Sequence, residues 1–336
     1  MRPVRSTLYV ASVFALLTGC SAGNVAPPTG YAPASNVAPW QRFTMRTIPP
    51  NPMNYDTTPR SGVYASQFDG PALLGYHAPN RKNHSPVCKV DANYVNGFSV
   101  DGTGNLVVPN GYPSVIGVFR GPDMCGKPMG TFKDPYGQAS DAASEDAASG
   151  TIVVGNIEGV SSDRAGNIAI CTLHHGCSRE LKSSHITYYG GGVALSKSGD
   201  CWMASEDNAS LSSATLTYFR GCKGGGTAAR GWKNAYYGGL ILDPKGYLIS
   251  IDYLAPAVWV YKGCNPLCHL VGGPFALQGD SLYGNLSGNL LAIGDSEFGQ
   301  VDVYSYSPKR ITYEYSFSQG LTPSDLVEAA GFSPST

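Results

Sequence analysis

The sequence is poor in charge and lacks a long apolar run. Asp, Glu, Lys and Arg make up only 14% of its 336 residues. The one apolar run that could be considered as a membrane span covers residues 8–17, about half of the roughly 20 residues that a spanning helix needs. The motifs G-x-S-x-G, H-E-x-x-H and the P-loop are absent as well. These absences argue against a membrane-spanning helix and against three common classes of enzyme.

Glycine, proline and tyrosine are abundant instead, with 42, 24 and 21 residues. This composition is typical of many short strands joined by tight turns. All-β domains of this length often form one unit. We therefore expect an all-β chain with almost no long helix.

The N-terminus has the anatomy of a secretory signal, with Arg2 and Arg5 before the apolar run and small residues after it. Residues 17–20 read Leu-Thr-Gly-Cys, which resembles the lipobox of bacterial lipoproteins. The resemblance implies cleavage after residue 19 and lipidation of Cys20, whose acyl chains would anchor the protein to a membrane. A plain signal peptide with a chance cysteine is the alternative.

Removing residues 1–19 leaves 21 basic against 24 acidic side chains, a net charge of about −3. A nucleic-acid-binding protein needs a basic surface to neutralise phosphates, so we expect no such partner. By resemblance to the sorting rule of proteobacterial lipoproteins, Ser21 favours the outer membrane or cell surface. Residues 20–58 are rich in Pro, Ala and Asn and show no periodicity, so we expect a flexible tether there. Residues 59–336 remain for one folded domain.

Eight cysteines remain besides Cys20, an even number in an exported chain, so we expect disulfides. Spacing favours Cys171 with Cys177, Cys264 with Cys268 and Cys201 with Cys222, and it leaves Cys88 with Cys125. A zinc site at Cys264, Cys268 and His269, or at His174, His175 and Cys177, is the alternative. Neither set has a second spaced pair of ligands to complete it.

A repeat begins after the tether. Residues 97–108 read GFSVDGTGNLVV, which predicts a hairpin around a D-x-x-G turn. A glycine that opens a strand, like Gly104, recurs at intervals of 42 to 49 residues: Gly62, Gly104, Gly150, Gly199, Gly246 and Gly288. A period in the forties with about four strands per unit is the signature of propeller blades. The sequence therefore predicts a six-bladed β-propeller with four antiparallel strands per blade.

Three details of this repeat lead to specific expectations. Residues 159–170 copy the hairpin, but a blade that started there would leave only 33 residues before Gly199, so we predict a third strand at residues 167–173. Residues 325–333 resemble an inner strand with no partner after it, and the first blade lacks one. We expect this C-terminal strand to complete the first blade, which leaves no long sheet edge exposed and favours a monomer. In other copies of the turn, Ser196 and Asn285 are expected to replace Asp101.

Six such blades resemble NHL-repeat, TolB-like and gluconolactonase-type propellers, as well as bacterial propellers of unknown function. The resemblance covers residues 60–336 and implies a fold rather than an activity. Gluconolactonase-type propellers hold a divalent metal in the channel through carboxylate and amide groups. The corresponding places here offer Asn96, Glu158, Asp280 and Glu328. Streptogramin-lyase-like catalysis would need a channel histidine, and none can be placed on an inner strand.

Tyrosines open several of the predicted inner strands: Tyr94, Tyr136, Tyr188, Tyr189, Tyr236, Tyr237 and Tyr283. Together with Asn96, Asp280 and Glu328 they would surround one channel mouth, where tyrosine suits stacking on sugars or peptides. Packing between blades is the alternative role. Residues 279–282 also spell the GDSL block of an esterase family, but that family's histidine lies downstream and the last histidine here is His269. A turn explains this block better.

These observations favour a non-enzymatic binding or scaffold module without a resident cofactor. It would be anchored to a membrane through Cys20 and would bind a protein or a polysaccharide of the cell envelope. The alternative is a metal-dependent hydrolase or lyase of the gluconolactonase or streptogramin-lyase type.

Overall fold

A computed structural model describes residues 45–47, 62–67, 72–91, 95–100, 104–111, 114–119, 128–146, 148–160, 165–208, 213–234, 236–322 and 326–332. Contacts divide the chain into residues 1–38 and residues 39–336, and every described residue belongs to the second unit. Cys20, Tyr94, Asp101 and Cys125 lie outside the described residues. The predictions made for them therefore stay predictions.

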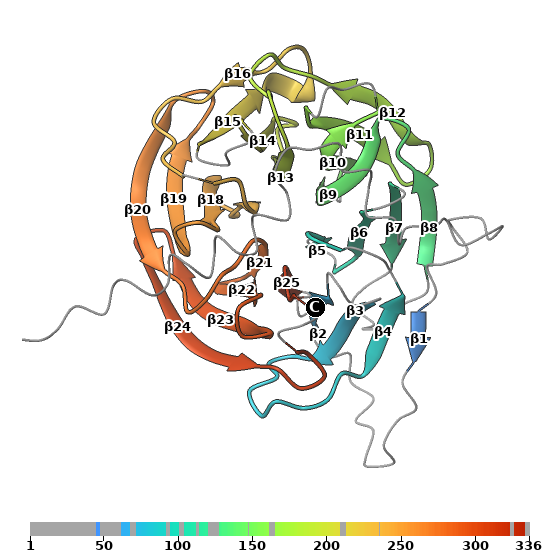
Figure 1. Cartoon of the computed structure of the whole chain (residues 1–336), viewed down its shortest axis with the longest axis vertical. Helices are drawn as coiled ribbons and strands as arrows, with labels where there is room; N and C mark the ends of the chain where they lie inside the picture. Colours follow the sequence, from blue (N-terminus) through green and yellow to red (C-terminus); the bar gives the residue numbers. More distant parts are fainter. Residues whose placement is uncertain are drawn as a thin grey trace, which may run out of the picture. The chain divides into compact units, whose positions relative to one another are not determined.

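Six antiparallel sheets surround a central axis (Figure 1). From inner to outer strand, blade 1 is β25 (Ala330–Phe332), β2 (Gly62–Gln67), β3 (Ala72–His77) and β4 (Cys88–Asp91). Blade 2 is β5 (Ser99–Val100), β6 (Leu106–Asn110), β7 (Val115–Phe119) and β8 (Pro128–Lys133). Blade 3 is β9 (Gly137–Asp146), β10 (Thr151–Gly159), β11 (Asn167–Thr172) and β12 (Gly176–Leu181).

The other three blades follow the same order. Blade 4 is β13 (Gly190–Leu195), β14 (Cys201–Glu206), β15 (Ala214–Phe219) and β16 (Thr227–Ala228). Blade 5 is β17 (Leu240–Leu242), β18 (Tyr247–Asp252), β19 (Ala257–Gly263) and β20 (Cys268–Ala276). Blade 6 is β21 (Gly284–Ser287), β22 (Leu290–Asp295), β23 (Gln300–Ser307) and β24 (Arg310–Phe317). The six-bladed, all-β prediction is confirmed, including a third strand that begins at Asn167.

The ring closes through the C-terminal strand, as predicted. β25 pairs antiparallel with β2 in the register Val63↔Phe332 and Ala65↔Ala330. One strand was not predicted: β1 (Met45–Thr47) lies within the range expected to be a tether and pairs with β4. Blade 1 therefore has five strands, with its first and last strands contributed by distant parts of the chain.

The hairpins between the first and second strands depend on a capping side chain and a glycine. In blade 5, one carboxylate oxygen of Asp243 accepts from the N–H of Lys245 and from that of Tyr247, each at 2.8 Å. In blade 4 the hydroxyl of Ser196 accepts from the N–H of Asp200 at 2.9 Å. Gly199 and Gly246 have φ values of 85° and 80°, a region that favours glycine. Ser196 thus caps its turn in the same way as the aspartate of a D-x-x-G turn.

The expectation for Asn285 was wrong. Blade 6 has a shorter hairpin, in which Ser287 pairs with Leu290, so that Asn285 lies inside β21 rather than at the turn. Its side chain amide donates to the carbonyl oxygen of Val100 in blade 2 at 3.5 Å. Sequence spacing alone could not show that β21 continues to Ser287, two residues after Asn285, before the hairpin turns.

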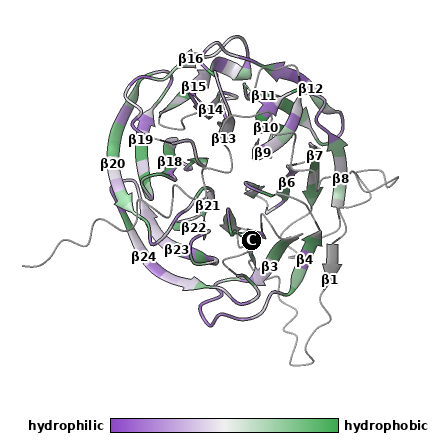
Figure 2. Cartoon of the chain, in the orientation of Figure 1, coloured by the Kyte–Doolittle hydropathy of each residue, from purple (hydrophilic) through white to green (hydrophobic). Residues whose placement is uncertain are grey.

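The core lies between neighbouring blades. Every residue of β2 and of β14 is buried, whereas the outer strand β12 is mostly half-buried or exposed. Figure 2 shows the same gradient, with β7 largely hydrophobic and β12 largely hydrophilic. Strands packed on both faces lose their alternating pattern and become continuous apolar runs, and this is why the second and third strands dominated the sequence repeat.

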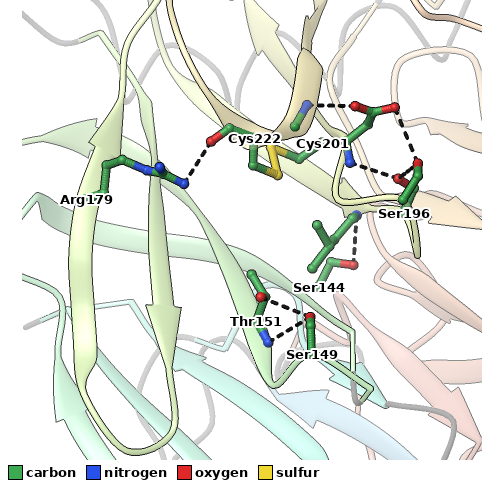
Figure 3. Close-up of a disulfide and its surroundings, with 11 residues drawn as sticks. Ser144, Ser149, Thr151, Arg179, Ser196, Cys201 and Cys222 are labelled. Atoms are coloured by element: carbon green, nitrogen blue, oxygen red, sulfur yellow. Dashed lines mark hydrogen bonds between the residues drawn. A yellow bond between two sulfur atoms is a disulfide. The ribbon is translucent and has the colours of Figure 1, made fainter.

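Three disulfides join Cys171 to Cys177, Cys201 to Cys222 and Cys264 to Cys268, the pairs that spacing favoured. The guanidinium of Arg179 in blade 3 donates to the carbonyl oxygen of Cys222 at 3.0 Å (Figure 3), so this hydrogen bond links blade 3 to the disulfide-bonded loop of blade 4. Disulfides indicate an extracytoplasmic location. They also use the thiols that the zinc alternative required. Across the described ranges, no helix has the length and apolar character to cross a membrane.

Because successive strands of a blade are antiparallel, all the inner strands run in one direction along the channel. We call the side on which they begin the start face and the side on which they end the end face. The second and third strands are joined on the start face. The third and fourth strands are joined on the end face, where all three disulfides lie.

Candidate functional site

The residues predicted to form a mouth lie just before the inner strands and therefore share the start face. Asn96 precedes β5, Tyr136 precedes β9, Tyr189 precedes β13, Tyr237 precedes β17, Asp280 and Tyr283 precede β21, and Glu328 precedes β25. The structure divides most of them among three groups of contacts. Each group adds an acidic or aromatic residue that the sequence did not single out.

Asp141 of β9 is the centre of the first group. Its carboxylate accepts a hydrogen bond from the side chain amide of Asn96 at 2.5 Å and another from the hydroxyl of Tyr283. The three residues come from blades 3, 2 and 6, so they meet across the channel. Burial raises the pKa of Asp141 to about 7, and the Asn96 hydrogen bond opposes this shift. Polar side chains that satisfy one another therefore fill this end of the channel.

Glu206, the last residue of β14, is the centre of the second group. The backbone N–H of Tyr237 donates to its Oε1 at 3.1 Å, whereas its buried Oε2 has no hydrogen-bond partner among the described residues. Burial, together with the negative charges of Asp207 and Asp252, raises the pKa of Glu206 to about 7. Partial protonation of Glu206 near neutral pH reduces the cost of burying this group.

Two tyrosines lie close to Glu206, whose charge raises the pKa of Tyr236 and that of Tyr237, although burial is the larger cause. The rings of Tyr236 and Tyr237 stack with centroids 4.7 Å apart and planes 20° apart, and the ring of Tyr253 lies 5.6 Å from that of Tyr236. Tyr237 also packs onto Gly191 of blade 4, where an added Cβ would lie 2.0 Å from the ring. The ring of Tyr189 lies against that of Tyr188, with centroids 4.2 Å apart and planes tilted by 39°. Much of the tyrosine surface is thus used for packing between blades, which was the alternative role.

The third group surrounds Tyr253. Burial and the negative charges of Glu328 and Asp280 raise the pKa of Tyr253 to about 12, and its hydroxyl shares a hydrogen bond with Ser296. Glu297 lies close enough to Asp280 for the charge of Asp280 to raise its pKa, although burial is the larger cause. Asp280 and Glu328 therefore lie near one tyrosine, while Asn96 belongs to the Asp141 group.

An apolar patch lies beside this third group. Three of the large exposed hydrophobic residues directly follow second strands on the start face: Val160, Leu254 and Phe298 are 54%, 43% and 50% exposed. Leu254 adjoins Tyr253, and Phe298 lies two residues beyond Ser296. We call Tyr253, Leu254 and Phe298 the start-face patch.

Other predicted residues lie elsewhere. The carbonyl oxygen of Tyr136 accepts from the side chain of Asn167 at 2.9 Å, so at least its backbone serves blade 3. Glu158 pairs with Ala139 in the sheet of blade 3. Ser281 of the GDSL block is fully buried, and its hydroxyl donates to the carbonyl oxygen of Gly279 at 3.2 Å, as a turn residue does.

The described residues contain no group of three or more His, Cys, Asp or Glu side chains that could hold a metal ion. The start face offers hydrogen-bond acceptors, tyrosine hydroxyls and an apolar patch. These are the components of a recognition surface.

No protein-family model matches the chain, and no curated protein matches it either. Among solved structures, a chain in the "Nidogen/Laminin Complex" is similar with a TM-score of 0.60 at 11% identity, covering 81% of this chain and 98% of that one. A putative 6-phosphogluconolactonase from Bacteroides fragilis gives 0.50 at 11% identity, with 83% and 99% covered. A functionally unknown protein from Desulfotomaculum acetoxidans gives 0.51 at 12% identity, with 80% and 84% covered. At these identities the likeness shows the fold alone.

Proposed function

We propose that this protein is a non-enzymatic binding module of the cell envelope, tethered by a lipidated Cys20, that binds a partner protein through its start face. The start-face patch carries this proposal. Leu254 and Phe298 expose apolar side chains on the loops that follow the second strands of the neighbouring blades 5 and 6, and Tyr253 joins these loops through its hydrogen bond with Ser296. Exposed apolar and aromatic side chains beside a polar rim are typical of protein-binding surfaces.

The charge around the patch indicates which charged side chains the partner carries. Asp280, Glu297 and Glu328 lie close to Tyr253 or to one another. Complementary charges speed encounter and select partners. We therefore expect basic side chains in the partner around an apolar centre. A polysaccharide would use the tyrosine rings rather than Leu254 and Phe298, which makes the two ligands separable by mutation.

The test is a matched pair of double variants. Leu254→Ser with Phe298→Ser should reduce capture of a partner protein from detergent-extracted envelopes at least tenfold, because buried anchors dominate interface energy. Leu267→Ser with Leu270→Ser is the control, since these leucines are 44% and 41% exposed but belong to blade 5 outside the patch. Glu297→Lys should weaken capture further in low salt.

Two outcomes would contradict this proposal. Equal loss in the control pair would mean that capture does not depend on the start face. Binding of isolated envelope polysaccharide, unaffected by Leu254→Ser and Phe298→Ser, would replace the partner protein with a polymer.

The anchoring has a separate test. Cys20→Ala should move the protein from the membrane fraction to the soluble fraction, and an unchanged distribution would remove the lipid anchor from the proposal. The competing function, a metal-dependent hydrolase or lyase, predicts a stoichiometric divalent metal in the purified protein. Metal analysis that finds one would favour that function over the binding module.

A further inference from the structure

The end face holds a second candidate site that does not depend on the proposed function. A pocket of about 1030 Å³ occupies the channel where the inner strands end. Its inner part is lined by apolar side chains, among them Phe98, Val193, Leu240 and Phe332, and Tyr283 also contributes to the lining. The hydroxyl of Tyr283 donates to Asp141, so Tyr283 stands between the pocket and the start face. Preformed concave sites of this size, mostly apolar with a few polar groups, are typical of small-molecule sites.

Lysines line the outer part of the pocket on one side. Lys197 lies in the hairpin turn of blade 4, Lys245 in that of blade 5, and Lys262 near the end of β19 in blade 5. All three are exposed. Within the described ranges none of them forms an ion pair with a carboxylate. The wall formed by blades 4 and 5 also carries two carboxylates, Asp200 and Asp243, so its three lysines leave it a net charge of +1, which an anionic ligand would offset.

The nearest carboxylates are engaged within the turns. Asp243 accepts two backbone N–H groups and the hydroxyl of Tyr306 at 3.1 Å. Asp200 accepts the N–H of Gly221 at 2.7 Å and a hydroxyl hydrogen bond from Ser198. Glu145 and Asp146 also line the pocket, but from blade 3, which blade 4 separates from the two lysines of blade 5. The positive potential is therefore greatest at the wall formed by blades 4 and 5.

We propose that the end-face pocket binds an amphipathic small molecule, whose apolar body lies between the inner strands and whose anionic group contacts Lys197, Lys245 and Lys262. The apolar lining selects the body, and the lysines select the charge. Both requirements can be measured separately with two dyes that share an aromatic skeleton. One is 8-anilinonaphthalene-1-sulfonate, which carries a sulfonate, and the other is N-phenyl-1-naphthylamine, which is uncharged.

The experiment titrates each dye into the folded wild-type protein and follows dye fluorescence. We expect one saturable site for the sulfonated dye. Lys197→Gln, Lys245→Gln and Lys262→Gln together should weaken its affinity at least tenfold and leave that of the uncharged dye within twofold. The control combines Lys82→Gln, Lys223→Gln and Lys309→Gln, which remove the same charge from exposed positions outside the pocket lining. Added salt should weaken the sulfonated dye only, because it screens exposed charges.

A second variant tests the location. Ser287→Trp places an indole at a half-buried position of the pocket lining and should abolish binding of both dyes. Unchanged binding in Ser287→Trp, equal loss in the two lysine triples, or no saturable site in the wild type would each overturn the proposal. If the three pocket lysine substitutions leave the affinity of the sulfonated dye unchanged, the proposal that the ligand is anionic is wrong.

Discussion

The two ends of the central channel are held in different ways. At the start face, side chains from blades 2, 3 and 6 meet at Asp141 and close the channel with hydrogen bonds. At the end face the channel widens into the pocket, and the three disulfides lie on that side of the blades. One end is filled by polar groups that depend on one another, and the other holds a pocket on the side of the blades that carries the disulfides.

The largest expected effect is on the closed end. Tyr283→Ala removes a buried ring and the hydroxyl that donates to Asp141. We expect the free energy of unfolding, measured by urea denaturation, to fall by about 3–5 kcal/mol. Tyr313→Ala on the outer strand β24, where the side chain is 40% exposed, should cost less than about 1 kcal/mol. Equal costs would mean that Tyr283 does not hold the channel closed.

The next effect concerns the braced end. Replacing Cys201 and Cys222 by Ala opens a loop with a sequence separation of 21, and we expect a loss of about 3 kcal/mol. Replacing Cys264 and Cys268, separated by 4 residues, should cost about 2 kcal/mol.

Hydrogen exchange shows which part of the protein is destabilised when Cys201 and Cys222 are replaced. Amides of residues 220–228 on the end face should exchange faster, while residues 236–239 on the start face should keep their rates. Faster exchange at both faces would show that the two ends are not independent.

A further effect is expected on the pH dependence of stability. The pKa of Asp141 rises from 3.8 to about 7 on folding, so the folded state holds a proton that the unfolded state has released. The free energy of unfolding therefore falls as the pH rises from about 4 to about 7, by up to about 1.4 kcal/mol per pH unit for this group. Asp141→Asn should reduce this slope between pH 5 and 7.

Glu314→Gln, an exposed substitution on β24, provides the control and should leave the slope unchanged. An equal slope in wild type and Asp141→Asn would mean that Asp141 is ionised in the folded protein. Glu206 contributes in the same direction, because its pKa is also raised to about 7, so some slope should persist in Asp141→Asn.

The fold could be predicted in detail because its repeat is made of local features. A glycine at each hairpin, a capping Asp243 or Ser196 and an apolar second strand recur in the chain itself. The features that the sequence did not predict correctly are smaller than the repeat unit. Asn285 has the spacing of a turn residue, but pairing between Ser287 and Leu290 decides where the hairpin closes. β1 has only three residues and pairs with a strand more than 40 positions away, which no local pattern reveals.

The site could be predicted only in part. The starts of the inner strands identified Asn96, Tyr237 and Tyr283, because those positions share one face. Asp141 was missed since it lies within the small-residue run GQASDAASED, where no apolar pattern marks it as buried. Glu206 had a usable signal: it is an acid at the end of the apolar strand CWMASE. The pocket lysines lie in or near turns. The turn motifs already explained these stretches of sequence, so the lysines were not singled out.

We propose that the start face, and not the end face, meets a partner protein. A photo-reactive phenylalanine analogue placed at position 298 or at position 309 of the full-length protein in intact cells tests this proposal. Phe298 lies in the start-face patch, and Lys309 is exposed in the β23–β24 turn on the end face. Irradiation should yield a defined cross-linked protein from position 298 and none from position 309. The same product from both positions, or a product from position 309 alone, would contradict the account.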